Sequence, residues 1–287
     1  MAMLALAAAA FPERVAAATF DHRLRAASAD EARMVSVACA TLGVPHAVLE
    51  PARTIAGASI QAQAREARYA ALFDWAQREG CGFLLTAHHA DDQAETLLMR
   101  LNRASGLSGL AGIRPIRVAG EVTILRPLLG WRRAELRAVV DACGLPFVDD
   151  PSNADPRHDR TRVRAVLAAT PALDPAALAA SAGYLGEAEE VLGWMAETEW
   201  TTRWHGPDRP FAIDDLPREL RRRLIRRAVH AARATLGIVL PPLAAAANVE
   251  PLLDAMKARR TATLGDLVIV PSEEGWTFRA APPRRSH

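Results

Sequence analysis

The chain has 287 residues, half of them apolar, and a formal net charge of +2. This length suits one large α/β domain and a smaller second one, and the apolar fraction excludes a disordered chain. Lys257 is the only lysine among the basic residues; arginine favours bidentate phosphate contacts, but the codon bias of a GC-rich genome explains this usage at least as well.

The three cysteines, Cys39, Cys81 and Cys143, are isolated and form no CxxC pair. A metal knuckle, a redox dithiol and a disulfide framework are therefore not expected, and a cytoplasmic setting fits. The apolar opening at residues 1–10 has no basic n-region, so we interpret it as a core helix rather than a secretory signal. No apolar run reaches the length of a membrane span, so no membrane partner is expected.

Strand and helix patterns alternate through the first part of the chain. Strands are predicted at residues 15–20, 46–49, 83–87 and 122–125, and helices at 30–42, 60–78, 91–104 and 132–143. Alternation of this kind predicts an α/β fold with a doubly wound parallel sheet. Its binding site is expected at the carboxyl ends of the strands.

From about residue 171 the pattern becomes helical. Helices are predicted at 176–200, 218–236 and 243–260, followed by a β-hairpin at 263–270 and 276–279. We therefore expect two domains, residues 1–170 and residues 171–287, the second a small helical and β-hairpin domain. The arginine-rich stretch 218–227 is either a solvated helix face or a surface that follows phosphates.

The most informative run is AHHADDQAET at residues 87–96, where a strand passes into a helix. Asp92 and Glu95 are three residues apart and share a face near the helix N-terminus, where the helix dipole favours carboxylates. This arrangement predicts a site for a cation, either Mg²⁺ or a substrate ammonium group. Two alternatives remain: an ordinary helix start with Asp91 as N-cap, or a zinc site, for which no further ligands suggest themselves.

Three other stretches carry candidate site residues. Asp21 and His22 end a predicted strand, where nucleotides dock in doubly wound folds, although the pair also suits a turn. Arg65 and Arg68 would neutralise phosphate charge if they are not a solvated face, and Arg68 is the stronger candidate. The glycines at 106, 109 and 112 have the wrong spacing for a dinucleotide fingerprint and predict either a mobile loop or a plain linker.

Several runs in this order resemble motifs of the tRNA(Ile)-lysidine synthetases, a branch of the PP-loop ATP pyrophosphatases. Besides 87–96, they are DHRLR (21–25), QAREARY (63–69), RASGLSGLAGIRP (103–115), DDPSN (149–153) with RTRVR (160–164), and TLG (263–265). The resemblance covers most of the chain. It implies a PP-loop, adenine nucleotide alpha hydrolase-like sheet whose first strand is missing here.

The resemblance also implies a reaction. ATP adenylates the C2 oxygen of the anticodon-wobble cytidine of tRNA(Ile) with a CAU anticodon, and free L-lysine then displaces AMP. ATP and Mg²⁺ are the implied cofactors. Whether the protein forms a homodimer is left open. The residues assigned are Asp92, Glu95, Arg68 and His88 for catalysis, with Asp92 also for Mg²⁺; Thr19, Phe20, Asp21 and His22 for ATP; and Arg103, Arg114, Asp150, Asn153, Arg160 and Arg164 for tRNA.

The family's SGGxDS phosphate loop does not occur in this sequence, and residues 1–6 resemble the segment that directly succeeds that loop in the family. We therefore expect a misassigned start codon, and little ATP binding or lysidine formation by the chain as written. Two alternatives stay open. A sister PP-loop tRNA-modifying enzyme such as a thiolase would require paired cysteines, and a non-catalytic tRNA-binding remnant would have lost its ATP chemistry.

Overall fold

The computed structural model describes residues 1–23, 28–57, 59–148 and 159–282. The chain divides into two compact units, Met1–Glu187 and Ala188–His287. Helix α8 (Pro175–Arg203) begins in the first unit and continues into the second. In the described part of the chain, no helix combines the length and the apolar composition needed to cross a membrane.

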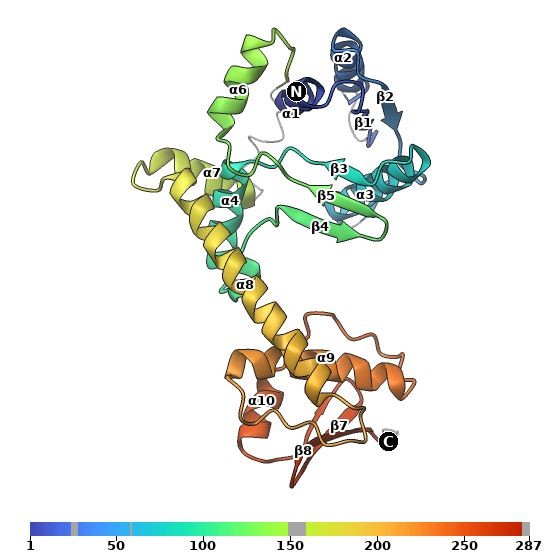
Figure 1. The fold of residues 1–287 in the computed structure, drawn as a ribbon, viewed down its shortest axis with the longest axis vertical. Coiled ribbons are helices and arrows are strands. Elements are labelled where there is room, and N and C mark those ends of the chain that lie inside the picture. The colour runs from blue at the N-terminus through green and yellow to red at the C-terminus, as the bar shows by residue number, and fades with distance from the viewer. Residues whose placement is uncertain (24–27, 58, 149–158, 283–287) are drawn as a thin grey trace. The chain divides into compact units, whose positions relative to one another are not determined.

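The first unit alternates strands and helices along the chain, as the sequence predicts (Figure 1). Its elements before α8 are α1 (Ala2–Ala10), β1 (Ala17–Phe20), α2 (Ser28–Thr41), β2 (His46–Leu49), α3 (Ile60–Arg78), β3 (Phe83–Leu85), α4 (Ala90–Leu101), α5 (Leu107–Leu110), β4 (Ile116–Ala119), β5 (Val122–Leu125), α6 (Arg133–Ala142) and α7 (Asp159–Ala169).

The strands form two small sheets. β1 pairs in parallel with β2, and β3 pairs in parallel with β5, which confirms the predicted parallel topology. β4 runs antiparallel to β5 and was not predicted, because it is a four-residue edge strand with Ile116 and Val118 exposed. Among the strands described, no ladder joins β1 to β3.

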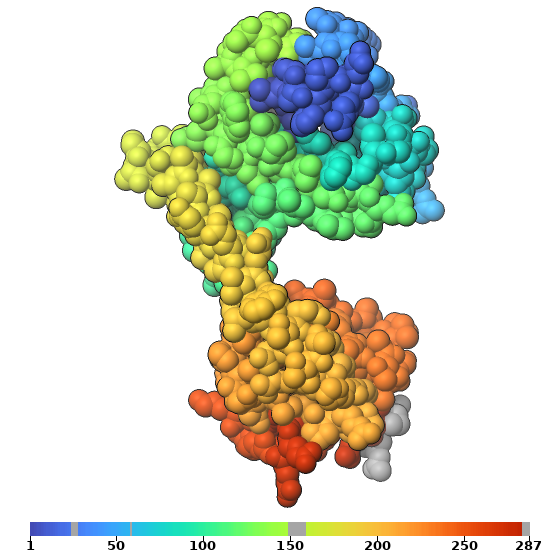
Figure 2. Space-filling view, in the orientation of Figure 1, coloured from blue at the N-terminus to red at the C-terminus, as the bar shows by residue number. Residues whose placement is uncertain are grey.

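Helix α3 packs against both sheets and gives them a common core. Trp75 on α3 clusters with Leu84 of β3 and Ile124 of β5, and Ala18 and Leu49 of the other sheet pack against the same cluster. A second cluster joins α1, α2 and α6, and the space-filling view shows α1, in dark blue, at the surface beside α6 and α2 (Figure 2). At the carboxyl ends of β3 and β5, the Thr86 N–H donates to the Leu125 carbonyl at 3.0 Å, and the chain continues from Thr86 into α4.

The second unit contains the end of α8 with α9 (Arg218–Thr235), α10 (Glu250–Lys257), β6 (Ala262–Leu264), β7 (Leu267–Ser272) and β8 (Gly275–Ala280). Its three strands form an antiparallel sheet in the order β6-β7-β8. The predicted single strand 263–270 is divided into β6 and β7, because Gly265 and Asp266 both have positive φ and make a tight turn. Phe211, Trp276 and Phe278 centre its apolar core.

Candidate functional site at the start of α4

The strand-to-helix junction lies where the sequence predicts it, but a different residue caps the helix. His89 is the N-cap of α4: its Nδ1 accepts a hydrogen bond from the Asp92 N–H at 3.4 Å, and the Asp92 carboxylate accepts one from the His89 N–H at 3.1 Å. The alternative with Asp91 as N-cap is therefore wrong. This reciprocal pair fixes the first turn of α4 and with it the orientation of Asp92.

Asp91 instead caps a different helix. Its carboxylate accepts a hydrogen bond from the Arg133 N–H at 2.8 Å, at the start of α6, and two from the Arg132 guanidinium at 3.3 Å. Burial alone would raise the pKa of Asp91, but these hydrogen bonds outweigh it and hold the pKa below its ordinary value. Arg132 also reaches Asp174, just before α8, at 3.4 Å. Arg132 therefore ties the starts of three helices together.

Glu95 lies one turn further along α4 and is almost completely buried, with 1% of its surface exposed. Two guanidinium groups of α7 hold it: Arg164 Nε lies 2.8 Å from Oε1, and Arg160 Nε lies 2.9 Å from Oε2. The Glu95 hydrogen bond raises the pKa of Arg164. Arg160 also comes within 3.9 Å of Asp92. The structure thus brings together two carboxylates and two arginines to which the sequence patterns gave different roles.

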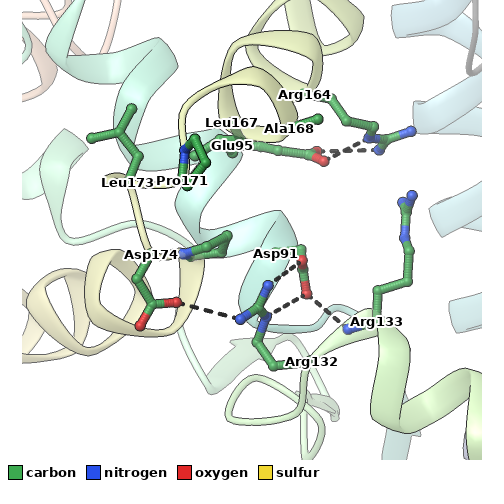
Figure 3. Close-up of a pocket in the computed structure, with 11 residues that line it drawn as sticks. Asp91, Glu95, Arg132, Arg133, Arg164, Leu167, Ala168, Pro171, Leu173 and Asp174 are labelled. Carbon is green, nitrogen blue, oxygen red and sulfur yellow. Dashed lines mark hydrogen bonds and ion pairs between the residues drawn. The ribbon is translucent and has the colours of Figure 1, made fainter.

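A cavity of about 390 Å³ opens beside this cluster (Figure 3). Its polar wall carries carboxylates and guanidinium groups, and its other wall is apolar. The polar lining residues are Asp91, Glu95, Arg132, Arg133, Arg164 and Asp174; the apolar ones are Leu167, Ala168, Pro171, Leu173 and Pro175. Such a lining suits a small zwitterionic ligand with an aliphatic stem, because it offers both signs of charge and an apolar surface.

His88 lies just before the α4 cap, with its Nδ1 3.0 Å from the Thr86 hydroxyl. The pKa of His88 is lowered to about 4, mainly by burial. The charge of Asp92 raises the pKa, whereas the charges of Arg126, Arg160 and Arg65 lower it. The imidazole is therefore neutral at physiological pH and can act as a hydrogen-bond or proton acceptor.

Arg68 does not line the cavity. It is exposed on α3, with its guanidinium 5.6 Å from the centre of the Tyr69 ring. Arg65, one turn earlier on the same helix, also stacks on Tyr69 at 5.0 Å and is the residue of the pair whose charge acts on His88. Spacing alone could not separate the two arginines, because both belong to one motif on one helix.

The residues assigned to ATP gather at the carboxyl end of β1. The Thr19 hydroxyl lies 2.9 Å from His46 Nε2, and Phe20 is partly buried. Asp21 is buried and accepts a hydrogen bond from the Arg23 N–H at 2.8 Å. A hydrogen bond with Ser28 lowers its pKa, as does the Arg23 N–H. His22 comes next in the chain, and none of these residues lines the cavity beside α4.

The residues assigned to tRNA are dispersed. Arg103 forms an ion pair with Asp159, and the Arg114 carbonyl accepts a hydrogen bond from Arg126 at 2.6 Å. Asp150 and Asn153 lie outside the described residues. The glycine loop carries the short helix α5, and the Gln93 amide clamps its end through two hydrogen bonds to Ile113. The loop therefore contains a helical turn and is not a plain linker, and its closure over a substrate stays a prediction.

Within the four described ranges, no three His, Cys, Asp or Glu residues are grouped so that they could hold a metal ion. The assignment of Mg²⁺ to Asp92 stays a prediction. Sequence reasoning missed Arg132 and Asp174, which line the cavity. A signal for Asp174 was present, because an aspartate directly before a proline is typical of a helix N-cap.

Known proteins resemble this chain over most of its length. A family model described as the PP-loop domain matches residues 1–170. The tRNA(Ile)-lysidine synthase of Novosphingobium aromaticivorans is 44% identical over 270 residues, covering 90% of this chain and 78% of that protein. The Zymomonas mobilis protein of the same name is 39% identical over 264 residues, with the same coverage. The chain belongs to the tRNA(Ile)-lysidine synthase family.

Members of this family are enzymes, ligases that form C–N bonds, and their PP-loop domain implies the use of ATP. A solved U34-tRNA thiolase from Methanococcus maripaludis has a similar fold, with a TM-score of 0.52, 15% sequence identity, and coverage of 65% of this chain and 68% of that one. The predicted PP-loop fold class is thereby confirmed.

Proposed function

We propose that the protein ligates lysine to the anticodon-wobble cytidine of tRNA(Ile) in an ATP-dependent reaction that forms lysidine. The observation that carries this proposal is the buried carboxylate and arginine cluster at the start of α4, beside a cavity of about 390 Å³. The family's relatives, named tRNA(Ile)-lysidine synthase, support the substrate and the product. The cytidine is adenylated first and aminated second.

The cavity beside α4 is the proposed lysine site. The aliphatic stem of the amino acid would pack on Leu167, Pro171 and Leu173. Glu95, already buried between two guanidinium groups, and Asp174 supply negative charge for the two ammonium groups. Arg133 supplies positive charge for the α-carboxylate, because its backbone N–H, and not its guanidinium, is the group that Asp91 engages.

In the first step, the C2 oxygen of the cytidine attacks the α-phosphorus of ATP, and the bond to pyrophosphate breaks. Asp92 is the carboxylate of this turn with the weakest arginine contact, at 3.9 Å, so it is the group that would hold Mg²⁺ together with phosphate oxygens. Bound Mg²⁺ would neutralise charge on the leaving pyrophosphate. Arg68 and the residues Thr19 to His22 are proposed to bind the nucleotide from the β1 side of the site.

In the second step, the lysine ε-amine attacks C2, and AMP leaves with the oxygen that had been activated. The attacking amine must lose a proton, and neutral His88 is proposed to accept it. With Nδ1–H donating to the Thr86 hydroxyl, Nε2 is left as the acceptor. Arg103, Arg114, Asp150, Asn153, Arg160 and Arg164 are proposed to contact the tRNA, which presents the splayed cytidine to this edge of the sheet.

The test is Asp92→Asn in a chain supplied with the family's SGGxDS loop, which this sequence does not contain, measured by incorporation of labelled lysine into a tRNA(Ile) transcript with a CAU anticodon. We expect incorporation to fall about 10²–10³-fold, as is typical when a group that stabilises developing charge is removed. The matched control is Asp74→Asn on α3, whose side chain is 76% exposed and pairs with Arg78. Near-normal incorporation by the Asp92 variant, with an unchanged lysine requirement, would contradict the assignment.

A further inference from the structure

Arg126 directly follows β5 and is buried, with 7% of its surface exposed. One of its terminal nitrogens donates to the Arg114 carbonyl at 2.6 Å, but its Nε is buried without an acceptor. Throughout the described ranges, no carboxylate pairs with it. Arg126 therefore differs from Arg132, Arg160 and Arg164, each of which is held by one or more carboxylates.

A guanidinium group has five N–H donors and a permanent charge, so its burial with one neutral acceptor is unfavourable. Proteins retain such a group where a charged partner binds to it, because the anion replaces the lost hydration. The burial of Arg126 and its unused Nε–H therefore point to an anionic ligand rather than to a purely structural role.

The position of Arg126 indicates where such an anion would lie. β5 pairs in parallel with β3, with Leu125 opposite Leu85, and the Thr86 N–H donates to the Leu125 carbonyl at 3.0 Å. Arg126 is thus level with Thr86, at the carboxyl edge of the sheet, where the chain turns through His88 into α4. The helix N-terminus adds partial positive charge to this edge.

The charges near this edge favour a multiply charged anion. Those that act on His88 are the carboxylate of Asp92, on α4, and three guanidinium groups: Arg126 after β5, Arg160 on α7 and Arg65 on α3. Glu95 pairs with Arg160 and Arg164, so with these two groups counted, two carboxylates stand against four guanidinium groups, a surplus of two positive charges. A phosphate group with two charges balances this surplus better than the single charge of an amino acid carboxylate.

We infer that Arg126 is a binding residue for the phosphate chain of the nucleotide, at the carboxyl edge of β3 and β5. The inference deepens the proposed function and rests on its use of ATP. The Nε–H of Arg126, which has no acceptor among the described residues, is the donor that would bind a phosphate oxygen. In that role Arg126 would hold the pyrophosphate portion of ATP while the α-phosphorus is attacked.

The probe is inorganic pyrophosphate, and its binding to the full chain is measured by calorimetry at low ionic strength. We expect Arg126→Met to weaken binding at least about tenfold, the size of a missing charge-assisted hydrogen bond. Arg117→Met on β4 is the matched control, since it removes an exposed arginine of the same sheet. If Arg126→Met lowers the melting temperature, the binding measurement uses Arg126→Lys instead. We expect this variant also to bind pyrophosphate more weakly, because lysine lacks the fork of donors.

Several outcomes overturn the inference: no pyrophosphate binding by the wild type, equal binding by the Arg126 and Arg117 variants, or an effect confined to the KM for lysine. A change only in the KM for tRNA also overturns it, because it assigns Arg126 to a backbone phosphate of the RNA. The calorimetric readout needs neither tRNA nor lysine. Failure of lysidine formation alone therefore contradicts the proposed function and leaves this result standing.

Discussion

Two regions of the molecule combine arginines and carboxylates at high density, with different outcomes. At the start of α4, Glu95 has a side chain that is 2% exposed and lies between Arg160 and Arg164. On α9, Arg222 pairs with Glu219 and Glu250, but these side chains are 30%, 34% and 41% exposed. The first cluster borders a cavity, whereas the second is a ladder of partly exposed ion pairs within α9 and between α9 and α10.

Burial, more than charge density, separates a candidate site from a solvated face. Exposed ion pairs contribute little, because water screens them and long side chains lose freedom when they pair. Burying a charge costs desolvation energy that only complete pairing offsets. The free energy of unfolding therefore depends strongly on each partner of a buried charge. The α4 cluster has this dependence, and the α9 ladder should lack it.

The largest expected effect comes from Glu95→Gln. The change leaves Arg160 and Arg164 without their common carboxylate, and the free energy of unfolding should fall by about 2–3 kcal/mol, less than for a fully buried pair because the two arginine side chains are 46% and 25% exposed. The measurement is chemical denaturation, with the slope compared between variants. Glu250→Gln, on α10, is the control because it removes a partner of the α9 arginines, and it should cost less than about 1 kcal/mol.

This control separates the effect of burial from that of a pKa shift, because the pKa of Glu250 is strongly lowered. Hydrogen bonds from Arg222 and Arg218 lower it to about 2, although 41% of the side chain is exposed. If pKa shifts measured stability directly, Glu250→Gln would be costly. Equal decreases for the two variants would therefore refute the distinction between the clusters by burial.

The sequence predicted the elements of the first unit well, because periodicity and glycine stops mark them clearly. His46–Leu49, Ile60–Arg78 and Val122–Leu125 have the predicted bounds. It missed α7 at Asp159–Ala169, whose apolar residues make no clear stripe and none of which is buried. It also could not show that Arg160 and Arg164 meet Glu95, because these residues are 65 or more positions apart and only the fold joins them.

A second prediction concerns pH and acts on the same cluster. His88 has a folded-state pKa of about 4, below the 6.5 of an unfolded histidine. As the pH falls, His88 takes up a proton in the unfolded chain at a higher pH than in the folded chain. The stability due to neutral His88 is therefore complete above pH 6.5 and is lost as the pH falls toward 4. The decrease should stay below the roughly 3 kcal/mol of an unscreened shift of this size, since the ring is partly exposed.

The check is the free energy of unfolding between pH 7 and pH 4.5 for the wild type and His88→Gln. The variant should lose less stability over this range, because glutamine does not titrate. The control is His205→Gln, which removes an exposed histidine of the second unit. Parallel curves for wild type and His88→Gln would mean that other groups dominate the acid transition.

The smallest effect is expected on α9 and concerns RNA binding. Arg222, Arg223 and Arg227 are held by acidic side chains, whereas Arg221 and Arg226 have no acidic partner in the described parts of the chain. If this helix follows phosphates, the two unmatched arginines carry the effect. Arg221→Gln with Arg226→Gln should then reduce the slope of log K against log salt for tRNA binding by about one for each phosphate that is no longer bound.

The matched double variant, Arg222→Gln with Arg223→Gln, should leave that slope nearly unchanged. Each of these guanidinium groups would have to leave a carboxylate before it could bind a phosphate, so little net electrostatic free energy is gained by the exchange. A slope that falls equally in both double variants would show that the ion pairs open readily on RNA binding. An unchanged slope in both would assign α9 to the solvated surface, and phosphate contacts would then have to come from the first unit.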